Sequence, residues 1–105
     1  MIEILKNLFG VGAQVNVGEL ISHGATIIDV RSTGEFQSGH LKNSINIPLD
    51  KLSNNLGKLD KSKPIITCCA SGMRSASAKN ILKSNGFTEV HNGGGWTSLR
   101  KFDNC

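Results

Sequence analysis

A cysteine followed by a short loop of small residues is the feature of this sequence best suited to chemistry. Cys69 ends an apolar run, and a helical pattern begins at Arg74. The cysteine would therefore lie at a helix N-terminus, where unpaired backbone N–H groups and the helix dipole favour negative charge. Gly72 permits the left-handed backbone that turns successive amides inward as an anion-binding nest. These features, with the positive charge of Arg74, lower a thiol pKa and predict that Cys69 is a nucleophile.

The alternative interpretation of Cys69 is a buried structural cysteine that acts as a small hydrophobic residue. For a lone cysteine this alternative would be preferred. The combination of cysteine, glycine and arginine at one turn favours the nucleophile instead. The residues expected to form the anion-binding loop are Ala70, Ser71, Gly72, Met73, Arg74 and Ser75.

Three further polar residues are candidates for a supporting role. Asp29 and Arg31 follow an apolar run, at the end of a predicted strand. We interpret them as an internal ion pair or hydrogen-bond network that holds the turn at Glu35, with binding of an anionic donor by Arg31 as the alternative. For His40 we expect a structural hydrogen bond. No Cys-x-x-Cys or paired-histidine spacing accompanies the three histidines, so we expect no metal.

The other two cysteines are expected to be less important. Cys68 is interpreted as a buried strand residue that faces away from Cys69, because a disulfide between adjacent residues is strained. Cys105 is interpreted as a C-terminal thiol. The alternatives are that Cys68 resolves an intermediate and that Cys105 accepts sulfur from Cys69 or pairs between molecules.

Short β-branched runs alternate with helical patterns along the whole chain. Strands are expected at 26–30, 44–48, 64–68 and 89–91, and helices at 17–22, 32–39, 50–56 and 74–85. Asn16 with Glu19 and Ser32 with Glu35 have capping-box spacing, and Asp50 is expected to cap the third helix. Such alternation predicts crossover units and a mainly parallel sheet. Ligands bind beyond the carboxyl ends of such strands, where the loop after Cys68 would lie.

The length of the chain sets the domain organisation. Its 105 residues and 11.2 kDa suit one domain, with a core at about 15–100. Ile4, Leu5, Leu8 and Phe9 suggest a short helical extension within residues 1–12.

Several ordered motifs resemble the rhodanese domain. The segment 69–75, CASGMRS, is similar to the active-site loop Cys-x-x-Gly-x-Arg-Ser of that family. The other matching stretches are 28–31 (IDVR), 35–36 (EF), 39–41 (GHL), 46–48 (NIP), 86–87 (GF), Val90 and 94–96 (GGW). The resemblance implies an open α/β fold with a mostly parallel sheet of five strands and helices on both faces.

The resemblance also implies a function. Cys69 would take a sulfane sulfur from a donor such as thiosulfate, carry it as a persulfide and pass it to cyanide, a thiol or a sulfur-carrier protein, without a cofactor. Related phosphatases and arsenate reductases have one more residue between the cysteine and the arginine, so the six residues from Cys69 to Arg74 favour sulfur transfer. The alternative is a binding or redox-sensing module that does not turn over.

The charge of the chain is moderately positive. Twelve Lys and Arg against eight Asp and Glu give +4, which favours anionic partners. The lysines are scattered, aromatic residues make up 5% and Tyr is absent, so we expect no nucleic-acid binding. We also expect no membrane association and a cytoplasmic location, because the sequence shows neither a targeting segment nor a long apolar run.

Overall fold

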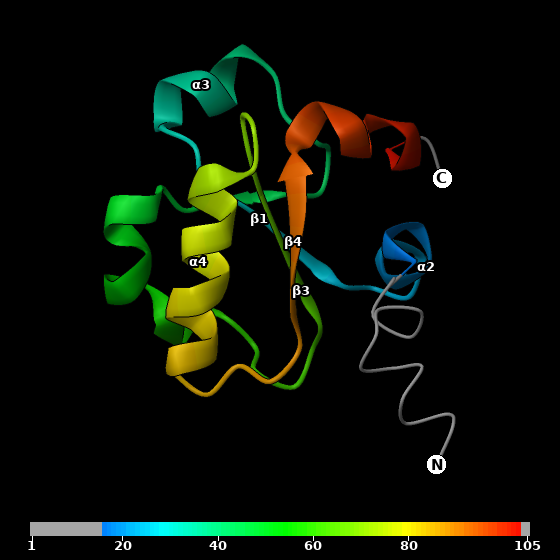
Figure 1. Cartoon of the computed structure of the whole chain (residues 1–105). Coiled ribbons are helices and arrows are strands. Elements are labelled where there is room, and N and C mark those ends of the chain that lie inside the picture. The colour runs from blue at the N-terminus through cyan, green and yellow to red at the C-terminus, as the bar shows by residue number, and fades with distance from the viewer. Residues whose placement is uncertain (1–15, 104–105) are drawn as a thin grey trace.

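A single parallel sheet organises the structure, a computed structural model that describes residues 16–103. Its strands are β1 (Thr26–Asp29), β2 (Ile45–Asn46), β3 (Ile65–Cys69) and β4 (Val90–Gly95), and every neighbouring pair is parallel in the order β2-β1-β3-β4 (Figure 1). This confirms the parallel α/β fold. Residues 16–103 supply four strands, where five were expected.

Helices cover both faces of the sheet, as expected. The α-helices are α2 (Val17–Ser22), α3 (Thr33–Ser38) and α4 (Met73–Ser84), and the 3-10 helices are η1 (Leu49–Asn54), η2 (Leu56–Lys58) and η3 (Trp96–Phe102). In Figure 1, α4 and the 3-10 helices η1 and η2 lie on one side of the sheet, and α2 and η3 lie on the other. The predicted helical extension at 1–12 lies outside the described residues.

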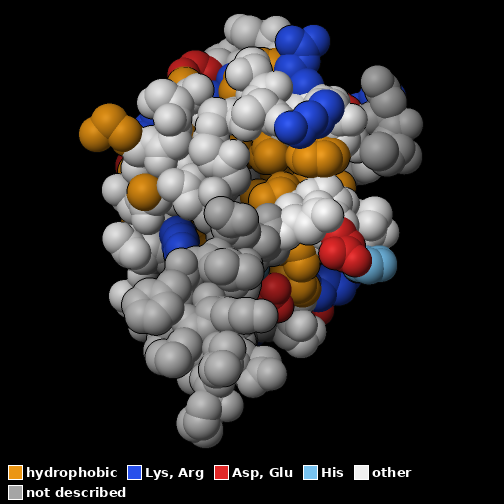
Figure 2. Space-filling view, turned by 45° about the vertical axis from the view of Figure 1, so that its right-hand side comes forward, with side chains coloured by type: hydrophobic (Ala, Val, Ile, Leu, Met, Phe, Trp, Pro, Cys, Tyr) orange, Lys and Arg blue, Asp and Glu red, His pale blue; other side chains and the backbone are white. Residues whose placement is uncertain are grey.

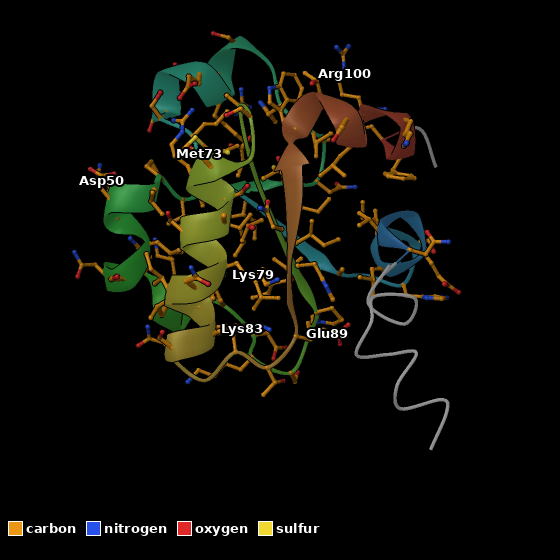
Figure 3. The ribbon with its side chains drawn as sticks, in the orientation of Figure 1. Asp50, Met73, Lys79, Lys83, Glu89 and Arg100 are labelled. Carbon is orange, nitrogen blue, oxygen red and sulfur yellow. The ribbon has the colours of Figure 1, made fainter. Side chains whose placement is uncertain are left out.

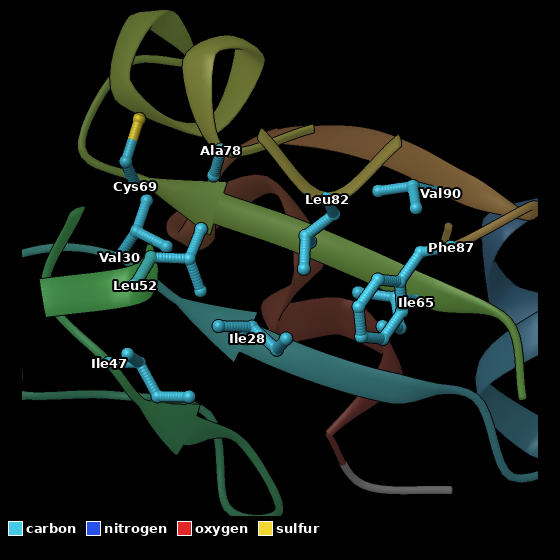
Figure 4. Packing of buried hydrophobic residues seen from close by; sticks show 10 residues of the cluster. All are labelled: Ile28, Val30, Ile47, Leu52, Ile65, Cys69, Ala78, Leu82, Phe87 and Val90. Atoms are coloured by element: carbon cyan, nitrogen blue, oxygen red, sulfur yellow. The ribbon is translucent and has the colours of Figure 1, made fainter. Parts of the chain in front are cut away.

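The two faces of the sheet bury separate apolar clusters, because successive strand residues point to opposite sides. The cluster beneath α4 includes Cys69 and Val30 (Figure 4), whereas Cys68 belongs to the cluster beneath α2 and η3. Both cysteines are fully buried free thiols. The expectation that Cys68 faces away from Cys69 is therefore confirmed, and the alternation directs Cys69 toward the N-terminus of α4.

Local hydrogen bonds explain where the predicted helices begin. The Ser32 side chain accepts from the Glu35 N–H, and the Glu35 carboxylate accepts from the Ser32 N–H, so the predicted capping box at α3 is complete. At α2 only half of the box forms, since Asn16 accepts from the Glu19 N–H. One such cap still satisfies an N–H group that the helix leaves unpaired.

Apart from β2, which is limited to Ile45–Asn46 where 44–48 was expected, and from one-residue shifts at other ends, two expected elements differ from the structure. Asp50 does not cap an α-helix: the segment forms the 3-10 helices η1 and η2, which follow Pro48 and are separated at Asn55, with φ −124°. The non-helical Asn55 interrupts this segment and limits it to short turns. The last strand is longer than 89–91, because β4 continues through its glycines to Gly95, which pairs with Cys69.

Candidate functional site

The sulfur of Cys69 lies in a ring of hydrogen-bond donors at the carboxyl end of β3. Its Sγ accepts from the Gly72 N–H at 3.0 Å and from the Ser75 N–H at 3.3 Å. The Ser75 Oγ lies 3.5 Å from the same sulfur. The N-terminus of α4 follows directly, so its dipole is also directed at the sulfur. This arrangement stabilises negative charge on Cys69 or on a sulfur attached to it.

Electrostatics distinguish the two adjacent thiols. Burial raises the pKa of Cys69, but the Ser75 hydroxyl and the N–H groups of Ser75, Gly72 and Ser71 outweigh it, so the pKa is lowered. Burial, assisted by the charge of Asp29, raises the pKa of Cys68 to about 12. Of these two adjacent thiols, Cys69 is therefore the one that ionises more readily.

Backbone geometry holds the predicted loop in place. Gly72 precedes α4 with φ 107°, in the left-handed region expected of a nest. A Cβ placed on Gly95 would lie 2.7 Å from the carbonyl oxygen of Ala70, so glycine lets β4 pass against the loop. The side chains of Ala70, Ser71 and Met73 are exposed, and Met73 is 80% exposed at the start of α4 (Figure 3). The loop thus directs amides inward and these side chains outward.

Arg74 makes an ion pair that the sequence analysis missed. Its guanidinium donates two hydrogen bonds to Glu35, at 2.7 and 3.1 Å. These bonds, with the Ser32 N–H, lower the pKa of Glu35 to about 2. Glu35 therefore offsets much of the positive charge that we assigned to the stabilisation of the thiolate, and Arg74 acts mainly to join the loop to α3. The capping-box spacing identified Glu35, but only as a helix cap.

Asn92 on β4 is a second polar residue that sequence reasoning missed. Its Oδ1 accepts from the Ser75 hydroxyl at 2.5 Å and from the Gly94 N–H at 2.9 Å, and its Nδ2 donates to the Gly72 carbonyl at 3.2 Å. Asn92 therefore contacts both residues whose amides hold the sulfur. The position of Asn92 just before three glycines is the sequence signal that could have found it, because glycines at a strand end often mark close backbone approach.

Asp29 and Arg31 form the buried ion pair that was expected. The Arg31 guanidinium donates to the Asp29 carboxylate, with a shortest distance of 2.7 Å, and to the carbonyls of Glu35 and Gly39. Arg31 is 4% exposed and also lies over the ring of Trp96. The pair holds the turn into α3, and its geometry supports the structural interpretation over anion binding.

His40 also makes a local contact. Its Nδ1 lies 2.7 Å from the Phe36 carbonyl, and its ring stacks on that of Phe36. The structural hydrogen bond expected of His40 is therefore present. Within residues 16–103, no three side chains of the His, Cys, Asp and Glu types are grouped closely enough to hold a metal ion.

A pocket of about 470 Å³ opens beside Arg74. It combines apolar residues with polar and charged groups, and the described residues that line it are Val30, Ser32, Thr33, Pro48, Leu49, Asp50, Lys51 and Arg74. Val30 also packs in the same buried cluster as Cys69 (Figure 4). Fold and site together define an α/β domain with a thiol at an anion-stabilising strand-to-helix turn.

Comparison with known proteins identifies the family. The sequence model of the rhodanese-like domain matches residues 14–101, and the chain belongs to the rhodanese-like domain family. It is 38% identical over 68 residues to the uncharacterized protein YqhL of Bacillus subtilis, covering 65% of this chain and 54% of YqhL. It is 33% identical over 72 residues to the thiosulfate sulfurtransferase GlpE of Pseudomonas savastanoi, covering 69% of this chain and 68% of GlpE.

A solved structure agrees with this assignment. A rhodanese with anions from E. coli matches with a TM-score of 0.67 and 34% identity, covering 70% of this chain and 89% of that one. The chain spans about half the length of YqhL and about two thirds of GlpE. Within residues 16–103, no helix has the length and apolar character required to cross a bilayer.

Proposed function

We propose that this chain is a sulfurtransferase in which Cys69 carries a sulfane sulfur from an anionic donor such as thiosulfate to a thiol or cyanide. One observation carries the proposal: the Cys69 sulfur accepts hydrogen bonds from the backbone N–H groups of Gly72 and Ser75, at a loop of six residues from Cys69 to Arg74. A relative named as a thiosulfate sulfurtransferase supports the same chemistry.

The first half-reaction loads the sulfur. The Cys69 thiolate attacks the outer sulfur of thiosulfate, and a new S–S bond forms while the bond between that sulfur and the sulfite group breaks. Sulfite leaves with the bonding electron pair, and Cys69 becomes an anionic persulfide. The N–H groups of Gly72 and Ser75 already point at the Cys69 sulfur, so they can stabilise this negative charge with little reorganisation. Since the lowered pKa of Cys69 favours the thiolate that attacks, the proposal requires no general base.

The second half-reaction unloads the sulfur. A thiolate or cyanide attacks the outer persulfide sulfur, the S–S bond to Cys69 breaks, and Cys69 leaves as a thiolate. The same donors that favour the thiolate make it a good leaving group. The acceptor becomes a persulfide or thiocyanate, and a sulfur-carrier protein with an accessible thiol would react in the same way.

Charge near the pocket favours anionic donors. Lys51, Arg74 and Asp50 line it, and Glu35 offsets much of the Arg74 charge, so the attraction rests mainly on Lys51 and on the formal charge of +4 of the whole chain. On the face shown in Figure 2 the basic side chains are separated by other surface residues and form no continuous stripe. This distribution suits a small anion better than a polyanion such as nucleic acid.

The test is the intact mass of the reduced protein before thiosulfate, after thiosulfate and after cyanide. We expect one added sulfur on Cys69, which cyanide then removes as thiocyanate. Cys69→Ser should remain unmodified. The matched control is Cys68→Ala, which removes the adjacent buried thiol and should still gain and lose one sulfur.

The opposite result would favour the alternative function. If neither thiosulfate nor a polysulfide adds sulfur to the folded protein, the chain does not transfer sulfur. The full burial of Cys69 would then indicate a rhodanese-fold binding or redox-sensing module that does not turn over. Partner binding that survives Cys69→Ser would support that module.

A further inference from the structure

The Ser75 hydroxyl has more hydrogen-bond acceptors within reach than it has protons. Its Oγ lies 2.5 Å from Asn92 Oδ1, 3.0 Å from the Gly72 carbonyl and 3.5 Å from Cys69 Sγ. A serine hydroxyl donates one proton and accepts through its lone pairs. Ser75 is fully buried, so its hydroxyl does not exchange hydrogen bonds with bulk water. Whichever group takes the proton decides whether Ser75 can donate to the sulfur.

The amide of Asn92 is oriented by two bonds that do not involve Ser75. The Gly94 N–H requires an acceptor and donates to Oδ1, while the Gly72 carbonyl requires a donor and accepts from Nδ2. These two contacts define which end of the amide is oxygen. Asn92 therefore presents its oxygen to the Ser75 hydroxyl.

When Cys69 is a protonated thiol, the hydrogen bonds form a chain in which each group donates to the next, from Cys69 through Ser75 to Asn92. The Cys69 S–H donates to Ser75 Oγ, and the Ser75 hydroxyl donates to Asn92 Oδ1. When Cys69 is a thiolate, its sulfur has no proton to give, and the hydroxyl can stabilise it only by turning away from Asn92. The oxygen of Asn92 and the thiolate thus compete for one proton.

We propose that Asn92 is a positioning residue that competes with the Cys69 thiolate for the Ser75 hydroxyl, and thereby limits how far this hydroxyl stabilises the thiolate. This role deepens the proposed function, because Cys69 must leave as a thiolate each time an acceptor removes its sulfur. The cost of turning the hydroxyl from Asn92 to the sulfur is then part of the barrier to sulfur release. Asn92 touches neither the sulfur nor the transferred atom in this scheme.

The substitution Asn92→Ala separates this role from mere support of the loop. If Asn92 competes for the proton, its removal frees the hydroxyl for the thiolate and lowers the thiol pKa. If Asn92 only holds the loop, its removal misaligns the amides of Gly72 and Ser75 and raises the thiol pKa. Asn92 is exposed, so truncation leaves no cavity in the core.

The experiment is the pH dependence of alkylation of Cys69 by iodoacetamide, with the modified cysteine located by fragmentation mass spectrometry. We expect Asn92→Ala to lower the midpoint by about 0.5 to 1 pH unit, or about threefold to tenfold in thiolate fraction, the equivalent of one net hydrogen bond. Asn85→Ala, which removes another exposed asparagine, at the far end of α4, is the matched control and should leave the midpoint unchanged.

A double-mutant cycle tests the route through Ser75. In the Ser75→Ala background, Asn92→Ala should no longer move the midpoint. The charged and titratable groups that interact with the sulfur, Arg74 with its partner Glu35 and the neighbouring Cys68, are the same in every variant. A raised or unchanged midpoint in Asn92→Ala, or an equal effect in both backgrounds, overturns the proposal. The titration reports on the thiol alone, so it gives an answer even if the chain transfers no sulfur.

Discussion

The close approach of β4 to the loop predicts a large effect for Gly95→Ala. The backbone of Gly95, with φ −71° and ψ 137°, is one that alanine adopts without strain. The added methyl group would nevertheless lie 2.7 Å from the Ala70 carbonyl oxygen, whereas ordinary contacts begin at 3.4 Å. The peptide that must move also carries the Ser71 N–H, one of the groups that lower the pKa of Cys69. A single methyl group therefore acts on both stability and reactivity.

The size of the stability loss follows from the short distance between the added methyl group and the Ala70 carbonyl oxygen. The loop must retreat by about 0.7 Å, the difference between these two distances. Overpacking of this kind costs about 1–3 kcal/mol of unfolding free energy. For a domain of this size, each kcal/mol lowers Tm by about 4–8 °C. The displaced Ser71 amide should also raise the pKa of Cys69 and slow its alkylation at neutral pH.

Urea unfolding and iodoacetamide alkylation at pH 7 measure the two effects. Gly34→Ala is the matched control: the residue lies in α3, and apart from its chain neighbours and the backbone of that helix, no atom lies within 4 Å of the added methyl group. It should leave alkylation unchanged and stability equal or slightly higher, since alanine favours helix. If Gly95→Ala equals the wild type in both measurements, the loop does not depend on close approach of β4, and the reasoning fails.

Two further predictions concern the ion pairs. The pKa of Glu35 is about 2 in the folded protein against an ordinary 4.5, so its bonds to Arg74 stabilise the fold above about pH 4.5 and lose effect as the pH falls toward 2. Thermal unfolding over this range should show a shallower decline of Tm for Glu35→Gln, and a decline as steep as in the wild type would contradict the pairing. Asp29→Asn should cost about 3–5 kcal/mol in urea unfolding, because it leaves the buried guanidinium of Arg31 without its carboxylate. The exposed Asp50→Asn should change stability by less than about 0.5 kcal/mol, and equal losses in the two variants would refute burial as the cause.

The parts of the fold predicted from the sequence are those governed by local patterns. The run from Ile65 to Cys69 has no charged residue and is apolar except for Thr67, as expected of a strand covered on both faces, and it forms the buried β3. Ser32 and Glu35 have the spacing at which two polar side chains cap the same helix turn. Such signals lie within a few residues, so one sequence contains them in full.

The parts that were missed depend on contacts between distant segments. Glu35 and Arg74 are 39 positions apart, and Ser75 and Asn92 are 17 apart. Their pairing follows from how α3 and β4 are placed around the loop, which no local pattern reports. The prediction of an α-helix at η1 was wrong for another reason. One turn of 3-10 helix and one turn of α-helix bury nearly the same side chains, so the apolar Leu52 did not distinguish the two.

The Glu35 carboxylate binds both the start of α3 and the Cys69 loop, and this double contact limits how the sequence can change in evolution. Its Oε1 accepts from both the Ser32 N–H and the Arg74 guanidinium, so it caps α3 and anchors the loop at once. Replacement of Glu35 by an apolar residue removes both contacts, and no single second change restores them. Positions 32, 35 and 74 should therefore vary together among descendants of this domain, and a lineage that loses Arg74 should still keep an acidic or amide residue at 35 wherever Ser32 persists.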